Sequence, residues 1–207
     1  RPLGRTIVHV ALVLSLAFGT LAAAAGYWAV VKAPELVRSP NDPAVIAAAR
    51  TVPRGKIIDR DGETLASNRT DENGETYRVY PSRALSQVVG YASARYGRAG
   101  LELAYDPELA GLAGDPLTDM FRKFLAEPYD PKDLTLALSL DLQKAAVKAL
   151  GERRGAVVML DPVTGEVLAL ASTPTYAASA VADPATSEET FEALLADERQ
   201  PLLPRAT

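Results

Sequence analysis

The feature that most constrains this chain is an uncharged segment near its N-terminus. No Asp, Glu, Lys or Arg occurs between Arg5 and Lys32, so residues 6–31 carry no full charge. As a helix rising about 1.5 Å per residue, this segment would reach roughly 39 Å. The hydrocarbon core of a bilayer is about 30 Å thick. The segment therefore predicts one membrane-spanning helix with some tilt.

Residues at the two ends of the segment predict its orientation. Tyr27 and Trp28 lie near its C-terminal end, and amphipathic rings prefer the headgroup layer of a bilayer. Arg1 and Arg5 precede the segment and favour a cytoplasmic N-terminus, although Lys32 on the other side weakens this bias. We expect a single-pass anchor with most of the chain outside the cytoplasm.

A cleaved signal peptide is the alternative interpretation of this segment. Residues 7–18 would form its apolar region, and the run LAAAAG at residues 21–26 offers small residues for a cleavage site. Under that alternative, the mature protein would be a secreted assembly module. We favour the anchor. The two hypotheses differ in the mass that they predict for the mature protein.

Small residues recur four positions apart along the predicted helix. Two overlapping series make up the pattern: Ser15, Gly19 and Ala23, and then Ala22 and Gly26. Small side chains at this spacing let two helix backbones approach closely in lipid. An alanine-rich segment also produces such spacings by composition alone. We take these five residues as a candidate face for a partner helix.

Composition narrows the chemistry of the remaining chain. The formal net charge of -4 argues against a general nucleic-acid binder. Without cysteine, the chain has no disulfides and no thiolate metal site. Its single histidine, His9, lies in the apolar segment, which leaves no histidine for a Ser-His pair elsewhere. We expect no metal or cofactor, and any enzyme here would use carboxylates, lysines or a serine with a lysine base.

The rest of the chain predicts an α+β protein. A juxtamembrane segment at residues 32–53 is rich in proline, and Pro43 suits the start of a short helix at 44–50. Residues 90–114, rich in glycine and tyrosine, predict irregular structure with small helices. Apolar runs and turn residues predict the following elements: strands at 56–58, 64–66 and 76–80, and turns at 60–62 and 71–74.

The last third has stronger periodicity. A strand at 134–138 should precede a helix at 140–150, which Gly151 ends. The expected apolar face of that helix is Leu142, Ala145, Ala146, Ala149 and Leu150. Two nearly unbroken apolar runs, 156–160 and 167–171, predict a hairpin covered on both faces. We expect residues 152–207 to open a larger domain that continues beyond them.

A final helix is expected near residues 187–196. Thr186 and Glu189 have the spacing of a capping box. Phe191, Leu194 and Leu195 would form the apolar face of this helix.

Two aspartates in the first predicted turn allow an enzymatic alternative. Asp59 and Asp61 follow a short apolar run, as the nucleophile and the acid/base do in haloacid-dehalogenase-type phosphohydrolases. The inserted Glu63, the short leading strand and the absence of a following βαβ pattern argue against it. Calcium loops here, or around Asp71, Glu72 and Glu75, lack the EF-hand spacing. Solvated turn carboxylates are the simpler interpretation.

Four segments resemble motifs of class B penicillin-binding proteins, in the order that the family has them. Residues 54–66, RGKIIDRDGETLA, resemble the RGxIxDRxGxxLA motif of the non-catalytic pedestal. Among the matching positions, we take Arg54, Gly55, Asp59, Arg60, Gly62 and Leu65 as the site residues of this motif. The other matches are VVGY at 88–91 with GLE at 100–102, LTL at 134–136 with LQ at 142–143, and residues 155–170, which resemble the first two transpeptidase strands. The loop at 174–176 also fits, although Ala177 replaces the family's aspartate.

The resemblance implies a division of the chain and an activity for the whole protein. It implies a pedestal at residues 54–151, between the anchor at 6–31 and the start of a transpeptidase domain at 152–207. In the family, a serine in a Ser-x-x-Lys motif, supported by Ser-x-Asn and Lys-Thr-Gly, cross-links peptidoglycan stem peptides through an acyl-enzyme. No serine here has lysine three residues later, and no lysine starts Lys-Thr-Gly. We therefore assign no catalytic residue and expect the nucleophile beyond residue 207.

The resemblance also implies a place and partners. It points to the bacterial cytoplasmic (inner) membrane and to a SEDS glycosyltransferase of the RodA/FtsW type as the membrane partner. Peptidoglycan would be reached through the rest of the transpeptidase domain, and no nucleic acid is expected. The predicted role of this portion is to hold that domain above the bilayer and to dock to the polymerase.

Overall fold

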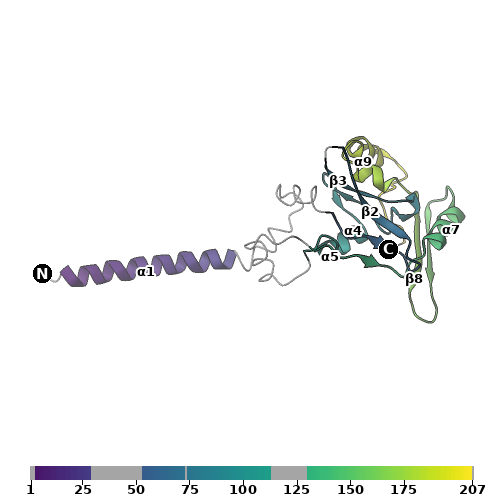
Figure 1. Cartoon of the computed structure of the whole chain (residues 1–207). Coiled ribbons are helices and arrows are strands. Elements are labelled where there is room, and N and C mark those ends of the chain that lie inside the picture. The colour runs from purple at the N-terminus through teal and green to yellow at the C-terminus, as the bar shows by residue number, and fades with distance from the viewer. Residues whose placement is uncertain (1–2, 29–52, 73, 113–129, 207) are drawn as a thin grey trace.

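The computed structural model describes residues 3–28, 53–72, 74–112 and 130–206 (Figure 1). Helix α1, Leu3–Tyr27, stands apart from the other described elements, and its described side chains are exposed. Its stretch Val8–Tyr27, with a mean hydropathy of 2.0, is long and apolar enough to cross a membrane. A signal sequence meets the same criteria, so the two hypotheses for this segment both stand. The predicted juxtamembrane helix at 44–50 lies outside the described residues.

A four-stranded sheet forms the centre of the pedestal. Its order is β3-β2-β1-β6, with antiparallel neighbours except for the parallel pair β1 and β6. The strands are β1 Ile57–Ile58, β2 Thr64–Thr70, β3 Thr76–Val79 and β6 Leu134–Thr135. The predicted strands and the turn at 60–62 are confirmed, but β2 is longer than residues 64–66 and β6 is shorter than residues 134–138. The N–H of Leu136 nevertheless donates to the carbonyl of Ile58, so the chain continues beside β1.

Short elements follow β3 in the described residues up to 112. They are the 3-10 helix η2 Arg83–Leu85, the strand pair β4 Ala92–Ser93 and β5 Gly97–Arg98, and the one-turn helices α4 Leu101–Ala104 and α5 Asp106–Leu109. The predicted irregular region with small helices is confirmed as far as residue 112.

Helix α7, Leu140–Leu150, has the predicted bounds, and Gly151 ends it with φ of 58°. Its predicted apolar face is partly wrong, because Ala145 and Ala149 are exposed while Gln143 is fully buried. The Gln143 amide donates to the carbonyls of Ala84 and Leu170 and accepts from the N–H of Leu170. A polar side chain with these partners can occupy the centre of a buried face.

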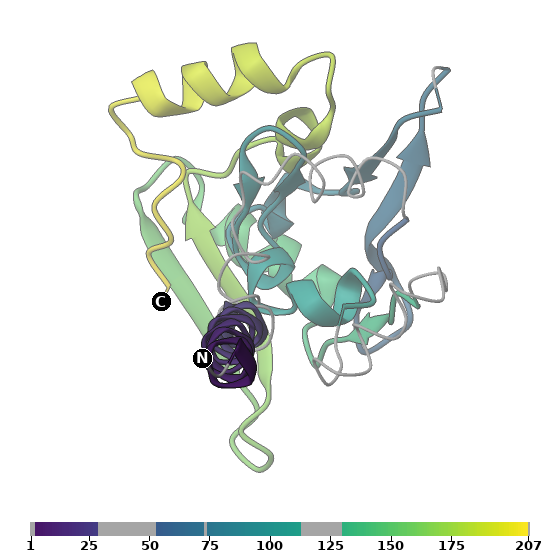
Figure 2. The same cartoon turned by 90° about the vertical axis from the view of Figure 1, so that its left-hand side faces the viewer.

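The predicted hairpin is formed by β7 Gly155–Leu160 and β8 Val167–Thr173. Helix α7 packs on one face of the hairpin, where Ala146 of the helix forms a small buried cluster with Ala169 and Ala171 of β8. Cover on both faces is expected from a larger domain and stays a prediction. Within the described chain the second face is open, since Val158 is 48% exposed and Leu160 57% exposed. The reason is that α7 reaches one face only. The loop end of the hairpin projects beyond the neighbouring elements (Figures 1 and 2).

Two helices follow, α8 Ala178–Ala182 and α9 Ser187–Ala196. The bounds of α9 are as predicted, but the capping box is wrong, because the Thr186 hydroxyl donates to the carbonyl of Ala180 instead. Phe191 and Leu194 pack against the core, whereas Leu195 is 66% exposed.

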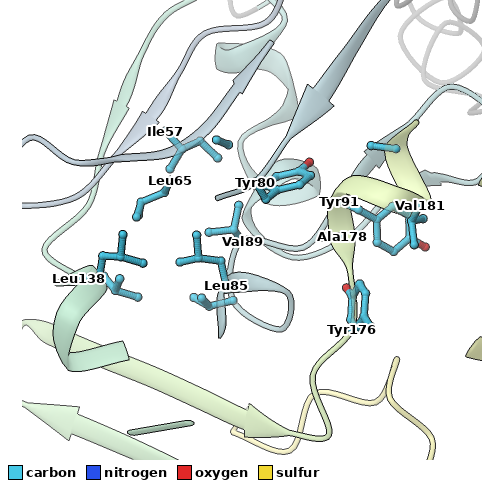
Figure 3. Packing of buried hydrophobic residues seen from close by; sticks show 14 of the residues in the cluster. Ile57, Leu65, Tyr80, Leu85, Val89, Tyr91, Leu138, Tyr176, Ala178 and Val181 are labelled. Carbon is cyan, nitrogen blue, oxygen red and sulfur yellow. The ribbon is translucent and has the colours of Figure 1, made fainter. Parts of the chain in front are cut away.

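One hydrophobic core joins the sheet to the segment after the hairpin (Figure 3). Ile57 and Leu65 from the sheet and Val181 from α8 belong to the same buried cluster. Tyr80 lies between these two groups in Figure 3. The sheet and the α8 region therefore pack as one continuous body.

Candidate functional site

The first candidate site is the small-residue face of α1. At about 100° per residue, its five residues fall within an arc of roughly 100° on the helix surface. All five are exposed, and a side chain added at Gly19 or Gly26 would meet no atom within 4 Å. Tyr27 and Trp28, the expected interface anchors, contact each other edge to face with ring centroids 6.3 Å apart. The structure thus leaves this face open to a partner, and its partner role stays a prediction.

The second candidate site is the motif at residues 54–66, which opens the pedestal. Gly55 donates its N–H to Leu109, and a Cβ atom added to it would lie 1.9 Å from the carbonyl oxygen of Lys132. Gly62 has φ of 89°, a conformation that suits glycine in the tight turn. Leu65 is fully buried. The motif therefore fixes close backbone packing and one core contact.

Arg54 begins a buried network of ion pairs. Its Nε lies 3.1 Å from Glu102 Oε2, its Nη2 donates to the carbonyl of Glu102, and its Nη1 lies 2.6 Å from Asp106 Oδ1. Glu102 is fully buried and Arg54 is 9% exposed. Charge-assisted bonds are needed to offset the cost of removing these charges from water.

Arg78 and Tyr80 enter the same network from β3 and the residue after it. Arg78 Nε lies 2.7 Å from Glu102 Oε1, and its Nη1 donates to Asn68 Oδ1. The Tyr80 hydroxyl donates to Glu102 and accepts from the N–H of Ala92. Burial and the nearby Glu102 carboxylate raise the pKa of Tyr80 well above its ordinary value. The phenol therefore keeps its proton and acts as a donor.

Asp106 and Arg98 complete the network on its more open side. Asp106 Oδ1 lies 2.9 Å from Arg98 Nε and also accepts from Arg54. Burial lowers the pKa of Arg98 below its ordinary value, although Asp106 opposes this shift. The network thus joins three arginines and two carboxylates from the motif, β3, β5, α4 and α5.

Asp59, the most buried acid of the motif, holds the first turn and caps α7. Its Oδ1 accepts from the N–H groups of Asp61 and Glu63, and its Oδ2 accepts from the N–H of Leu140, the first residue of α7. Burial alone would raise the pKa of the Asp59 carboxyl, but these backbone donors hold it below the ordinary value. A carboxylate at a helix N-terminus is stabilised by the unpaired N–H groups there.

This geometry gives no support to the phosphohydrolase alternative. Asp59 is occupied by backbone donors, and Asp61 is an exposed turn residue. Within the described ranges, no group of three or more acidic or histidine residues could hold a metal ion. The strand β1 also pairs antiparallel with β2, unlike the parallel succession of a phosphohydrolase core. In the other proposed calcium loop, Asp71 accepts from the N–H of Glu75 within its own turn.

The remaining motif arginine faces outward. Arg60, 41% exposed in its side chain, lies 3.8 Å from Glu166 in the loop of the β7–β8 hairpin. Such an exposed pair contributes little to stability. Its position nevertheless marks where the pedestal motif meets the hairpin.

Several polar contacts join the pedestal to the segment after the hairpin. Ser179 of α8 exchanges hydrogen bonds with the backbone of Tyr80, and Gln87 donates to the carbonyls of Pro174 and Pro201. Arg95 forms a two-pronged pair with Glu188 of α9. Tyr96 stacks on Phe191 with centroids 4.1 Å apart. These contacts hold α8 and α9 against the pedestal.

The sequence reasoning missed Arg78, Arg98 and Asp106 and named Glu102 only within a family match. Arg78 and Tyr80 are two residues apart, so their side chains lie on the same face of the extended chain. This spacing is a local sign that both side chains point inward. Charged residues are normally placed at the surface from sequence, because their burial depends on partners far along the chain.

Comparisons with known proteins agree with this arrangement. The family described as "Penicillin binding protein A dimerisation domain" matches residues 54–129. The chain is 33% identical to the peptidoglycan D,D-transpeptidase PbpA of Mycolicibacterium smegmatis over 96% of this chain and 42% of that protein. It is 34% identical to the peptidoglycan D,D-transpeptidase MrdA of Escherichia coli over 65% of this chain and 26% of that protein.

A solved structure gives the same result in three dimensions. The imipenem acyl-enzyme of penicillin-binding protein A from M. tuberculosis matches with a TM-score of 0.63 and 27% identity. That match covers 75% of this chain and 38% of the other. The chain thus spans about two fifths of the length of the PbpA relative that it matches. Motif order, fold and sequence agree: the chain belongs to the class B penicillin-binding proteins, of which it represents an N-terminal portion.

Proposed function

We infer that this chain is the membrane anchor and pedestal of a peptidoglycan D,D-transpeptidase. The observation that carries the proposal is the continuous core, in which the motif strands and the α8 region share buried residues such as Leu65 and Val181. A pedestal packed in this way holds the start of the transpeptidase domain in a fixed orientation. The relatives PbpA and MrdA are both named peptidoglycan D,D-transpeptidases, which supports this activity for the whole protein.

Penicillin acylation tests this activity. The full-length protein that contains this chain is expected to form a covalent adduct with fluorescent penicillin, visible as a labelled band after denaturing electrophoresis. Residues 1–207 alone are expected to remain unlabelled, because they contain no Ser-x-x-Lys motif. A full-length protein that resists labelling while folded would contradict the proposal.

The proposed partner is a SEDS glycosyltransferase of the RodA/FtsW type, bound through the small-residue face of α1. This face is exposed, and small residues permit close helix packing in lipid. Ala23→Leu and Gly19→Leu add bulk to it and should reduce co-purification of the partner several-fold. Ala17→Leu is the matched control, because Ala17 is also exposed but points to the opposite side of α1. Equal co-purification of all variants would defeat this assignment.

Docking through α1 would let the pedestal influence the partner's polymerase. A coupling of this kind requires two partner states that the pedestal distinguishes. Lipid II polymerisation should therefore rise when the full-length protein is added to the purified partner, and Ala23→Leu should remove that rise while Ala17→Leu keeps it.

The proposed topology places the N-terminus in the cytoplasm and the pedestal outside the inner membrane. Mass spectrometry of the protein purified from membranes separates this from the secreted alternative. Retention of residues 1–28 is expected. A mature protein that begins after residue 26 would establish cleavage of a signal.

A further inference from the structure

A small cavity lies beside the buried ion-pair network, on the side where edge strand β3 meets the β4–β5 pair. Its volume is about 40 Å³, and Arg54, Arg78 and Arg98 all line it, together with Asn68, Ser93 and Ala94. We call it the arginine cavity. Neither the anchor nor the transpeptidase role uses it.

One donor of the network has no acceptor. Arg78 is 2% exposed; its Nε is bound by Glu102 and its Nη1 by Asn68, but its Nη2 has no hydrogen-bond partner among the described residues. A buried charged donor without a partner costs about 1–3 kcal/mol or more. This donor belongs to Arg78, which is one of the residues that line the cavity.

The charge around the cavity also favours an anion. Three guanidinium groups there share two carboxylates, those of Glu102 and Asp106, which leaves one positive charge without a counter-charge in the network. Glu75 lines the cavity as well, but it is only half-buried at the rim. The Arg98 side chain is only 19% exposed, and its burial lowers the pKa of this group.

Size and hydrogen bonding narrow the class of anion. One water needs roughly 10–15 Å³ of such volume, so the cavity has room for about three water-sized groups. This suits a carboxylate, which has three heavy atoms, better than a phosphate. The Ser93 hydroxyl accepts from the N–H groups of Arg95 and Tyr96 and so can direct its own proton to an acceptor.

We propose that the arginine cavity binds one carboxylate group, which accepts from Arg78 Nη2 and the Ser93 hydroxyl. The carboxylate belongs either to a small organic acid or to an acidic side chain of another protein. Both sources offer the same chemistry, and exposed Pro184 at the cavity rim leaves a route from the surface.

The test is thermal unfolding of the detergent-solubilised chain, with sodium acetate replacing sodium chloride at constant ionic strength. At ten times the dissociation constant, the melting temperature should rise by about 3–6 °C. A capped peptide, acetyl-Gly-Glu-Gly-amide, is the second probe. A rise with the peptide as well as acetate indicates that a protein side chain can reach the cavity, and a rise with acetate alone indicates a small acid.

Variants at Ala94, in the turn after β4, test the cavity without removing any member of the charge network. Ala94→Asp places a carboxylate in the cavity wall and should abolish the acetate response, whereas the isosteric Ala94→Asn should keep it. Arg95→Met removes an exposed arginine of the same turn and should also keep it. No response in the unaltered chain, or an equal response in both Ala94 variants (an adventitious ion only), would overturn the proposal. These measurements involve neither penicillin nor the membrane partner, so they fail or succeed independently of the proposed function.

Discussion

The β2–β3 hairpin and the β7–β8 hairpin place opposite kinds of residue in unexpected surroundings. Beside β2 and β3, the charged Arg78 and Glu102 are almost completely removed from water. On β7 and its loop, the apolar Val158, Leu160 and Val163 remain 48%, 57% and 91% exposed. Hydrophobicity therefore does not by itself decide burial in this chain.

The two hairpins differ in how far their buried or exposed side chains find partners within this chain. The charges beside β3 are tolerated because nearly every donor and acceptor has a partner. The exposed apolar residues of β7 have no comparable cover among the described residues, since α7 covers only the face that holds Ala169 and Ala171. We infer that further protein covers β7, most simply the rest of the proposed transpeptidase domain.

The largest expected effect comes from breaking the charge network. Glu102→Gln keeps the shape of the side chain but leaves Arg54 and Arg78 facing a neutral group, which should cost about 3–5 kcal/mol of unfolding free energy. Urea unfolding followed by near-UV circular dichroism measures this, because Tyr80, Tyr91 and Tyr176 are buried.

Glu188→Gln is the matched control for that prediction. It makes the same chemical change at an exposed pair with Arg95. No measurable loss of stability is expected there. Similar losses of unfolding free energy in the two variants would show that the buried network stabilises the fold no more than an exposed ion pair does.

The next largest effect concerns backbone packing at Gly55, just before β1, and at Gly155 in β7. Gly55→Ala places a Cβ atom 1.9 Å from the carbonyl oxygen of Lys132, so the backbone at one of these two residues must move, at a cost of about 3 kcal/mol. In β7, Gly155→Ala meets only Leu150 Cδ2 at 3.5 Å, and its effect should stay within about 0.5 kcal/mol. Unfolding midpoints of both variants check this contrast. Equal midpoints would mean that the contact at Gly55 relaxes freely.

Asp59 should show an intermediate, pH-dependent effect. Asp59→Asn weakens the bonds to the first turn and to α7, and should cost about 1–2 kcal/mol at pH 7. The folded-state pKa of Asp59 is lowered, and the unfolded value is about 3.9. The carboxylate therefore stabilises the fold above about pH 4, and this contribution is lost as pH falls through the folded pKa.

Unfolding of the two proteins at pH 7 and at lower pH tests this sign. The stability difference between the unaltered chain and Asp59→Asn should shrink as the pH drops below about 4. Asp61→Asn is the control, because Asp61 is exposed in the same turn. A difference that grows in acid would contradict the assigned role.

The smallest effect is expected at the exposed face of the β7–β8 hairpin. Val158→Thr should change the stability of this chain by no more than about 0.5 kcal/mol. In the full-length protein the same change should cost clearly more, because an added domain would bury the side chain. Val157→Thr, on the α7 side of the hairpin, should destabilise both proteins. Equal effects of Val158→Thr in both would show that β7 stays uncovered.

Local elements could be predicted well because their signals are local. The bounds of α7 follow from its apolar spacing and from Gly151, and the bounds of α9 were also predicted correctly. Errors arose where side chains from distant segments compete for a position. Gln143 replaced the expected alanines at the buried face of α7 because Ala84 and Leu170 offer it backbone partners.

The family, the order of its parts and most local elements can be predicted from the amino-acid sequence alone. An uncharged run long enough for a bilayer and the glycine turn of the motif need no knowledge of distant contacts. Which charges are buried depends on contacts between distant segments: Arg54 and Glu102 lie 48 positions apart, and Asp59 and Leu140 lie 81 apart. The physical reason is that a buried charge is stable only beside its partner, and a linear pattern does not record which distant residue that partner is.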